Sequence, residues 1–490
     1  MAFLKLSELS QIVKNKVVIY LASRYITYAI QFVTSLIIAA KLGPYYMGIW
    51  GFVLLLLNYF QQFHFGISNS FNVLYVQNRE NRAECDNYVG NSLVLIFYLA
   101  AIIIILYVCY SIFGFESFEK YHARRYMLWV CIIAILQHFT AFFINLFRVK
   151  NLLNHVTICQ SIIVFLNFIC VFLFEGDLLI FALLAGYLIG NLVAVVLAVS
   201  SRVLPQVNSI SINCNYQRRI LKKGFYLFLY NSCFYFIVIS IRTIISGFYA
   251  VEEFGMFTFS FSLAHAILLL LEALSFVIFP KILSKLSSPD SNERKRTINF
   301  YRETYISSAH FLVYLALPLF PVLLSFFPKY ESAITALNLI SLSIVINTNS
   351  CGYADLLIAN NKEKSLMKLS FMALILNCVI ALLLVKIYHV QYYYVILATL
   401  ITYFVYSFSV IVSGEKFITQ KARSRTIISE FFPLRLAIPY CCALFLSVLQ
   451  VKGVYMTIPL ALFAFFNFKT MANIKDTVLK LLFKPEVVNL

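Results

Sequence analysis

Two arginines lie well inside long apolar stretches of this sequence, where a charged side chain is costly and so points to a binding site or a pathway. Arg24 lies in residues 17–40 and Arg242 in residues 225–248. A guanidinium group stays charged and binds phosphate oxygens through two parallel hydrogen bonds. Both arginines are therefore candidates to contact an anionic group, such as a phosphate, on a ligand. The alternative is that their long side chains reach the nearer membrane surface.

Polar side chains accompany the arginines at helical spacing. Tyr28, Gln31 and Ser35 follow Arg24 at intervals of three or four residues, which places all four on one face of a helix. Similar polar stripes are expected on the next apolar stretch and on the stretch that holds Arg242. The candidate ligand-binding residues are Arg24, Tyr28, Gln31, Asn58, Gln62, Asn231, Tyr235 and Arg242.

Three further ionisable residues are candidates for ion coupling or charge pairing. His265 and Glu272 are seven residues apart and therefore share a helical face, and Asp355 lies in the apolar stretch 333–359. A short carboxylate in hydrocarbon must be paired, protonated or exposed to a water-filled cavity. Each of the three would bind an ion that drives transport, or would pair with an arginine while no ligand is bound. The alternative is an ion pair with a purely structural role.

The elements that must position these residues follow from the composition. Of 490 residues, 61% are hydrophobic and 12% charged, whereas a soluble domain carries about 25% charged residues. Because a bilayer is crossed by ~20 apolar residues in a helix, the sequence predicts an all-α polytopic membrane protein with about fourteen spanning helices. The predicted spans are residues 17–40, 47–67, 89–111, 126–147, 155–174, 178–200, 225–248, 257–280, 304–327, 333–359, 365–385, 392–413, 433–450 and 454–468.

Lysine and arginine are unevenly distributed between the two ends of these spans. The segments on the side of the N-terminus hold 30 of them and those on the other side hold 7. By the positive-inside rule, both termini are predicted to be cytoplasmic. The same rule explains the net charge of +18 without a nucleic-acid partner. The longest polar segments, residues 201–224 and 281–303, are predicted to be cytoplasmic loops.

The second half of the sequence repeats the first. With a small slip in register, the aligned pairs are Gly48 with Gly255, Asn145 with Asp355, Asn151 with Asn361, and Asn167 with Asn377. Two halves in the same orientation would enclose a central cavity, although chance similarity between apolar segments is the alternative. The repeat predicts an N-terminal six-helix lobe (1–210), a C-terminal six-helix lobe (211–425), and two additional helices with a basic cytoplasmic tail (426–490).

The chain also resembles a known family. The motif LGPYYMGIW after the first span, the motif FRVKNLLNH after the fourth, and the layout of six, six and two helices are similar to the polysaccharide-exporter branch of the multidrug/oligosaccharidyl-lipid/polysaccharide superfamily, in particular its O-antigen flippases. This resemblance implies a bacterial inner-membrane protein that flips undecaprenyl-diphosphate-linked oligosaccharide, by alternating access, from the cytoplasmic to the periplasmic leaflet. The implied partners are this lipid-linked oligosaccharide, membrane lipids, a polysaccharide polymerase and a chain-length regulator.

Some functions find no support in the sequence. There is no glycine-rich phosphate loop and no Cys/His set at metal-ligand spacing, so no cofactor, no metal and no enzymatic activity are predicted. Two alternatives remain. One is a multidrug efflux antiporter of the same superfamily, which the cationic stripes disfavour because a cation carrier needs a negative cavity. The other is a membrane polysaccharide polymerase, which usually has a long outward loop.

Overall fold

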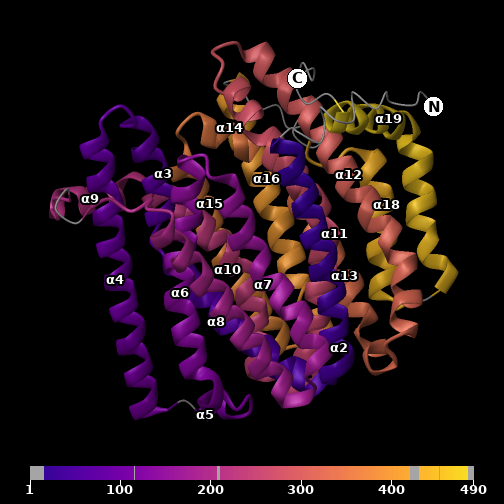
Figure 1. Ribbon diagram of the computed structural model, residues 1–490. Helices are drawn as coiled ribbons and strands as arrows, with labels where there is room; N and C mark the ends of the chain where they lie inside the picture. The colour runs from indigo at the N-terminus through magenta and orange to yellow at the C-terminus, as the bar shows by residue number, and fades with distance from the viewer. Residues whose placement is uncertain (1–15, 115, 207–209, 420–429, 452, 484–490) are drawn as a thin grey trace, which may run out of the picture. The chain divides into compact units, whose positions relative to one another are not determined.

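The protein is helical throughout the part of the chain that the structure describes. The computed structural model describes residues 16–114, 116–206, 210–419, 430–451 and 453–483, and these residues contain helices and turns but no strand. Figure 1 shows long helices, such as α4 (Arg82–Phe113) and α6 (Ala123–Val149), joined by shorter ones, such as α5 (Glu116–Glu119) and α9 (Cys214–Lys223). The predicted all-α class is therefore confirmed, and each of the fourteen predicted spans falls mainly on helical residues.

The helices of the first half correspond to the first six predicted spans. The first two spans form one long element, α2 (Lys16–Gln62), which bends at Gly43 with φ 66° and ψ 175°. Only glycine adopts such a conformation without strain, and Pro44 then restarts the helix because it needs no N–H partner there. The other helices are α3 (Ile67–Gln77), α4 (Arg82–Phe113), α5 (Glu116–Glu119), α6 (Ala123–Val149), α7 (Leu153–Leu173), α8 (Gly176–Ser200) and α9 (Cys214–Lys223).

The second half continues with the remaining spans and two appended helices. Its helices are α10 (Phe225–Phe248), α11 (Val251–Leu286), α12 (Ser291–Ser325), α13 (Ile334–Asn347), α14 (Tyr353–Ala359), α15 (Glu363–Lys386), α16 (Leu397–Thr419), α18 (Leu434–Val448) and α19 (Ile458–Phe483). Short 3₁₀ turns join some of them, at Pro328–Ala333, Thr348–Ser350, Tyr392–Tyr394 and Gly453–Thr457.

Length and hydropathy agree with a polytopic membrane protein. Among the described residues, ten helical segments are long and apolar enough to cross a membrane, and two more apolar helices are shorter. The first of the ten, Ser23–Gln77, contains two predicted spans. The remaining predicted span is α11, whose side chains between residues 270 and 281 lie outside the described residues. Large apolar side chains on these helices are exposed, as on α4, where Phe113 is 80% exposed.

Contacts within the chain define two compact units. The N-terminal unit comprises residues 19–232 and 250–255, and the C-terminal unit comprises residues 233–249 and 256 onward, together with the start of the chain. The core of the N-terminal unit includes the fully buried rings of Phe71, Phe142 and Phe147. The three-part division expected from the repeat stays a prediction.

Two expectations about connections are wrong. Residues 281–303 do not form a long loop, because α11 runs to Leu286 and α12 starts at Ser291. Hydropathy marks where a helix enters the hydrocarbon, whereas Asp290 caps α12 further out by accepting the N–H of Asn292 at 2.8 Å. Residues 201–224 likewise contain a helix, α9.

The predicted span 333–359 is not one continuous helix. It is interrupted at Thr348–Ser350, and Gly352 has φ 83°. Arg302, which is 6% exposed, donates hydrogen bonds to the carbonyl oxygens of Asn349 at 2.5 Å and Cys351 at 2.9 Å. The guanidinium thereby satisfies backbone acceptors that the interruption releases, as a buried backbone requires.

The repeat is visible in local backbone geometry. Asn151 and Asn361 follow α6 and α14, and both adopt a left-handed conformation, with φ 59° and 56°. In the first case Leu152 N donates to Phe147 O at 2.8 Å, and in the second Lys362 N donates to Leu357 O, also at 2.8 Å. Both helices therefore end in the same Schellman-type cap, with asparagine in the position that glycine usually occupies.

The aligned glycines meet in a reciprocal contact inside the N-terminal unit. A Cβ added to Gly48 on α2 would lie 2.1 Å from Val251 O at the start of α11. A Cβ added to Gly255 on α11 would lie 1.9 Å from Pro44 O on α2. Since residue 44 aligns with residue 251 in the same register as the two glycines, the crossing is symmetric with respect to the repeat. Each glycine is there because the opposite backbone occupies the space of a side chain.

We expect Gly255→Ala to lower stability by about 1–3 kcal/mol, because the added methyl group overlaps a backbone carbonyl that must move. The matched control is Gly247→Ala, at a helical position where a Cβ would meet no atom within 4 Å. The unfolding midpoint of the detergent-solubilised protein measures both. An equal midpoint for the two variants would contradict the tight crossing.

Candidate functional site

Arg24 lies in a polar contact between α2 and α7 of the N-terminal unit. Its guanidinium donates to Tyr28 Oη at 2.7 Å and to Gln160 Oε1 at 3.1 Å. One turn of α2 separates Arg24 from Tyr28, and the guanidinium carbon lies 4.8 Å from the centre of the Tyr28 ring. Next to this contact, the hydroxyl groups of Thr27 and Ser161 are 3.0 Å apart. Arg24 is therefore half-buried and hydrogen-bonded to neutral groups.

The other predicted residues of this unit are less closely grouped. Gln31 is exposed, and Asn58 is half-buried. Gln62 near the end of α2 accepts a hydrogen bond from Ser232 Oγ at 3.5 Å. Asn231, the neighbour of Ser232 on α10, is exposed. The structure thus joins Arg24 to Tyr28 and Gln160, and it joins Gln62 to Ser232 on α10.

Sequence reasoning missed the partners of Arg24 on α7. Gln160 and Ser161 are adjacent polar residues within the apolar span 155–174, and both turn out to face α2. A polar pair in an otherwise apolar span was the available signal, because such side chains need a partner inside the membrane.

Arg242 is buried in the C-terminal unit between α10 and α11. It is 3% exposed, and its guanidinium carbon lies 5.1 Å from the centre of the Phe261 ring. The His265 ring packs on the same Phe261 ring at 3.9 Å between centres, and His265 Nδ1 lies 3.0 Å from Phe261 O. Phe261 therefore brings together one predicted ligand-binding residue and one predicted coupling residue. Tyr235, two turns earlier on α10, is half-buried.

The two predicted carboxylates have different outcomes. The side chain of Glu272 on α11 lies outside the described residues. Asp355 is 9% exposed and sits in the first turn of α14, where its Oδ2 accepts the Gly352 N–H at 3.0 Å. This contact stabilises the start of the helix that follows the interruption at Thr348–Ser350. The geometry gives Asp355 a capping role, and ion coupling by Asp355 stays a prediction.

A buried charged cluster in the C-terminal unit was also missed. Tyr353 Oη donates to Glu415 at 2.5 Å and to Glu430 at 2.9 Å, and the Arg302 guanidinium lies 4.9 Å from the Tyr353 ring centre. Glu415 is 3% exposed and lies 3.9 Å from Lys295 Nζ. Hydropathy places Arg302 and Lys295 in a loop and therefore predicts no buried partner for either side chain.

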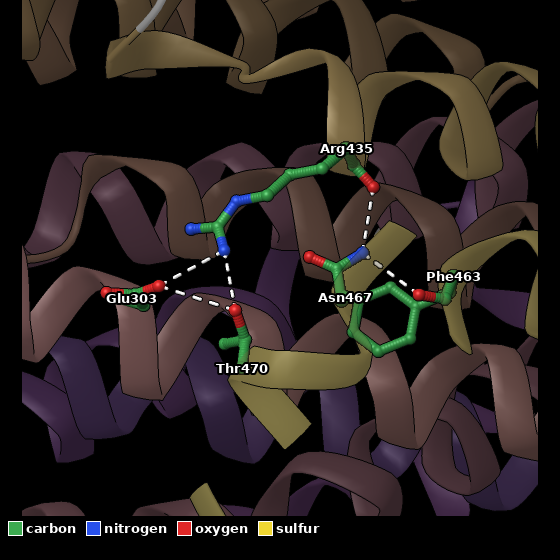
Figure 2. Close-up of polar contacts among 5 residues, drawn as sticks. All are labelled: Glu303, Arg435, Phe463, Asn467 and Thr470. Carbon is green, nitrogen blue, oxygen red and sulfur yellow. Dashed lines mark hydrogen bonds and ion pairs between the residues drawn. The ribbon is translucent and has the colours of Figure 1, made fainter. Parts of the chain in front are cut away.

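Polar contacts also fasten the two appended helices to α12. Figure 2 shows Arg435 of α18 donating to Glu303 Oε1 of α12 at 3.1 Å and to Thr470 Oγ1 of α19 at 2.7 Å. Asn467 Nδ2 donates to Arg435 O at 2.9 Å and to Phe463 O at 3.0 Å, at a point where α19 is kinked. The kink frees a backbone carbonyl, and the amide side chain satisfies it.

Comparison with known families and structures adds three findings. The family model described as "polysaccharide biosynthesis protein" matches residues 13–287. Comparison of the sequence with curated proteins gives no significant match. Among solved structures, similar folds occur in transporters.

The solved structures share the fold at low sequence identity. An inward closed structure of the lipid II flippase MurJ has a TM-score of 0.69 and 13% identity, covering 94% of this chain and 100% of that one. An inward-facing multidrug resistance MATE family transporter of the MOP superfamily has a TM-score of 0.64 and 14% identity, covering 83% and 99%. The MATE multidrug transporter DinF-BH has a TM-score of 0.55 and 17% identity, covering 82% and 95%.

We expect Arg302→Ala to be strongly destabilising, because it leaves the carbonyl groups of Asn349, Cys351 and Glu430 without their donor. Each buried acceptor without a partner costs about 1–3 kcal/mol. The control is Arg296→Ala on the exposed face of the same helix, with an expected change within about 0.5 kcal/mol. Thermal unfolding in detergent compares the two, and similar midpoints would refute the role of Arg302 in supporting the interrupted helix.

Asp355 offers a test of capping against ion coupling. Asp355→Ala should lower stability by about 1 kcal/mol because the Gly352 N–H loses its acceptor. Asp355→Asn keeps an oxygen in place and should preserve both the unfolding midpoint and transport. Loss of transport in Asp355→Asn at an unchanged midpoint would instead show that the negative charge itself is needed.

Proposed function

The chain belongs to the polysaccharide biosynthesis protein family, and on this premise we propose that it is a flippase that carries a lipid-linked oligosaccharide across the membrane. The cargo we propose is an undecaprenyl-diphosphate-linked O-antigen unit or a similar repeat unit. It would pass from the cytoplasmic to the periplasmic leaflet of a bacterial inner membrane, with both termini of the protein in the cytoplasm. A polysaccharide polymerase and a chain-length regulator would act with it.

The observation that carries this proposal is the way Arg24 is held. Its described hydrogen bonds go to Tyr28 and Gln160, which are both neutral. These bonds keep the guanidinium solvated by protein when no cargo is present. A diphosphate oxygen carries negative charge and forms a stronger, bidentate contact with the same nitrogens. The cargo can therefore displace Gln160 and Tyr28 from Arg24. The guanidinium then has hydrogen-bond partners both before and after the headgroup binds.

Arg242 would act at a different stage of transport. At 3% exposure, with Phe261 over its guanidinium, it reaches a headgroup only after the contact between α10 and α11 opens. Alternating access supplies such an opening, because a carrier of this kind exposes its site to one side at a time. His265 packs on the same Phe261 ring and would move with it.

A second candidate is efflux of cationic drugs, which the fold shared with the MATE transporters favours. The side chains weigh against it. Arg24 and Arg242 both bring positive charge to candidate binding residues, and a cationic drug would be repelled by them. A polysaccharide polymerase is also disfavoured, since the described connections at 116–122, 174–175 and 326–333 are short.

The direct test is translocation of a lipid-linked oligosaccharide in proteoliposomes. We expect Arg24→Ala to slow translocation about tenfold or more, because one charge-assisted contact contributes about 1.5–3 kcal/mol. Arg24→Lys should be intermediate, since it keeps the charge and loses the bidentate geometry.

The matched control is Gln160→Ala, which removes a partner of Arg24 and leaves its guanidinium in place. We expect Gln160→Ala to change the rate by no more than about threefold, the effect of one neutral hydrogen bond. Unfolding midpoints must be similar across the series. Wild-type transport by Arg24→Ala would refute the role of the arginine, and absence of translocation by the unaltered protein would refute the proposed cargo.

A further inference from the structure

A cavity of the N-terminal unit lies outside the site described above. It has a volume of about 480 Å³ and is lined by Tyr45, Tyr46, Glu119, His122, Ala123, Arg124, Arg125 and Asp177. These residues come from the bend in α2, from α5, and from the first turns of α6 and α8. The cavity therefore lies at the ends of membrane-crossing helices. On α2 it lies at the bend near Gly43, which is the end of the first segment of α2 that is farther from the N-terminus.

We propose that this cavity binds sugar, as the pocket that receives the oligosaccharide of the cargo on the outer side of the membrane. The inference rests on the proposed function and adds a second binding site to it. A pocket for a small ligand usually measures about 300–1,000 Å³, so this cavity has room for one or two sugar rings.

The chemistry of the lining suits a glycan better than a lipid or a free anion. Arg124 and Arg125 are balanced by Glu119 and Asp177, so the wall has no strong net charge to select an anion. Ala123 is the single aliphatic side chain in the lining, so the other apolar surface of the wall is aromatic. Sugar hydroxyl groups both donate and accept hydrogen bonds, and a wall with both guanidinium and carboxylate groups offers partners for both.

An aromatic platform completes the site. Tyr45 and Tyr46 pack edge to face at 5.4 Å between ring centres, and Tyr45 is 36% exposed. An exposed, rigid tyrosine combines an apolar face with a polar hydroxyl, as a sugar ring requires. His122 Nε2 lies 3.1 Å from Tyr45 Oη and holds the ring in place.

Some wall residues are fixed and others are available. Asp177 is held by an ion pair with Arg125 and a hydrogen bond from Tyr126. Beside the cavity, the Tyr121 ring stacks on Phe52 at 4.3 Å, which anchors the connection between α5 and α6. Arg124 is exposed and forms no ion pair within the described residues. Its donors can therefore bind a ligand without breaking an internal contact.

The backbone supports the same conclusion. His122 adopts a left-handed conformation with φ 51°, directly before the first turn of α6. A residue other than glycine in this region is strained, and such strain tends to be kept at functional sites. In this conformation His122 lines the cavity beside Tyr45, directly before α6.

The test is binding of a defined sugar to the full-length protein in nanodiscs. The probe is the lipid-free repeat oligosaccharide released by mild acid from the surface polysaccharide of the producing cell. Calorimetric titration should show binding that Arg124→Ala and Tyr45→Ala each weaken about tenfold. Tyr45→Phe keeps the ring and should retain most of the affinity.

Two controls separate this site from the transport site. Arg218→Ala removes an exposed arginine on α9, outside the cavity, and should leave binding unchanged. Arg24→Ala should also leave it unchanged. Binding that survives both cavity substitutions, or no binding at all, would overturn the inference. Competition by inorganic pyrophosphate instead of sugar would overturn it as well, since that would identify an anion site.

Different results would refute the proposed function and the sugar site. If the unaltered protein binds the probe at the cavity but does not translocate the lipid-linked form, the sugar site stands and the flippase proposal is refuted. If translocation is normal and the cavity variants bind the probe like wild type, the flippase proposal stands and the sugar site is refuted.

Discussion

Hydrocarbon cannot form hydrogen bonds, and this one constraint shapes the whole chain. Every backbone N–H and C=O group within the bilayer needs a partner in the protein, which is why the described residues are helical. The informative places are those where a helix is interrupted. At Thr348–Ser350 the guanidinium of Arg302 takes over the released carbonyl groups, and at the kink in α19 the amide of Asn467 does so.

The same constraint decides how a buried arginine can exist. Three arginines show three kinds of contact: Arg24 with neutral side chains, Arg242 with an aromatic face among its contacts, and Arg302 with backbone carbonyl groups. The three arrangements differ in how easily a ligand can replace the protein groups that contact the arginine. Backbone carbonyl groups cannot move away without unfolding a helix, so Arg302 is structural. The side-chain partners of Arg24 can rotate, and this makes Arg24 the better candidate for a ligand that comes and goes.

The sequence predicted the helices well because hydropathy reports directly on which residues must face lipid. The fourteen spans and the repeat followed from local pattern, and so did the alignment of Asn151 with Asn361. Their shared left-handed conformation is a finding of the structure. The interruption at Thr348–Ser350 and the polar partners of Arg24 and Arg302 did not follow from local pattern. Gln160 meets Arg24 across 136 residues of chain, and Arg302 meets Asn349 across 47. The sequence shows that Gln160 is a polar residue in an apolar span. It does not show which helix Gln160 contacts, since pairings of that range depend on how helices pack.

The two halves of the repeat share some features and differ in others. The crossing of Gly48 and Gly255 and the caps at Asn151 and Asn361 are kept, because each depends on backbone shape. The charged positions are not kept. Arg24 lies near the start of α2 and aligns with Asn231, whereas Arg242 lies near the end of α10 and aligns with Ser35. Duplication alone would place both arginines at one depth. Within the proposed function, each arginine then lies at a different position along its own helix and would contact an anionic headgroup at a different step of transport.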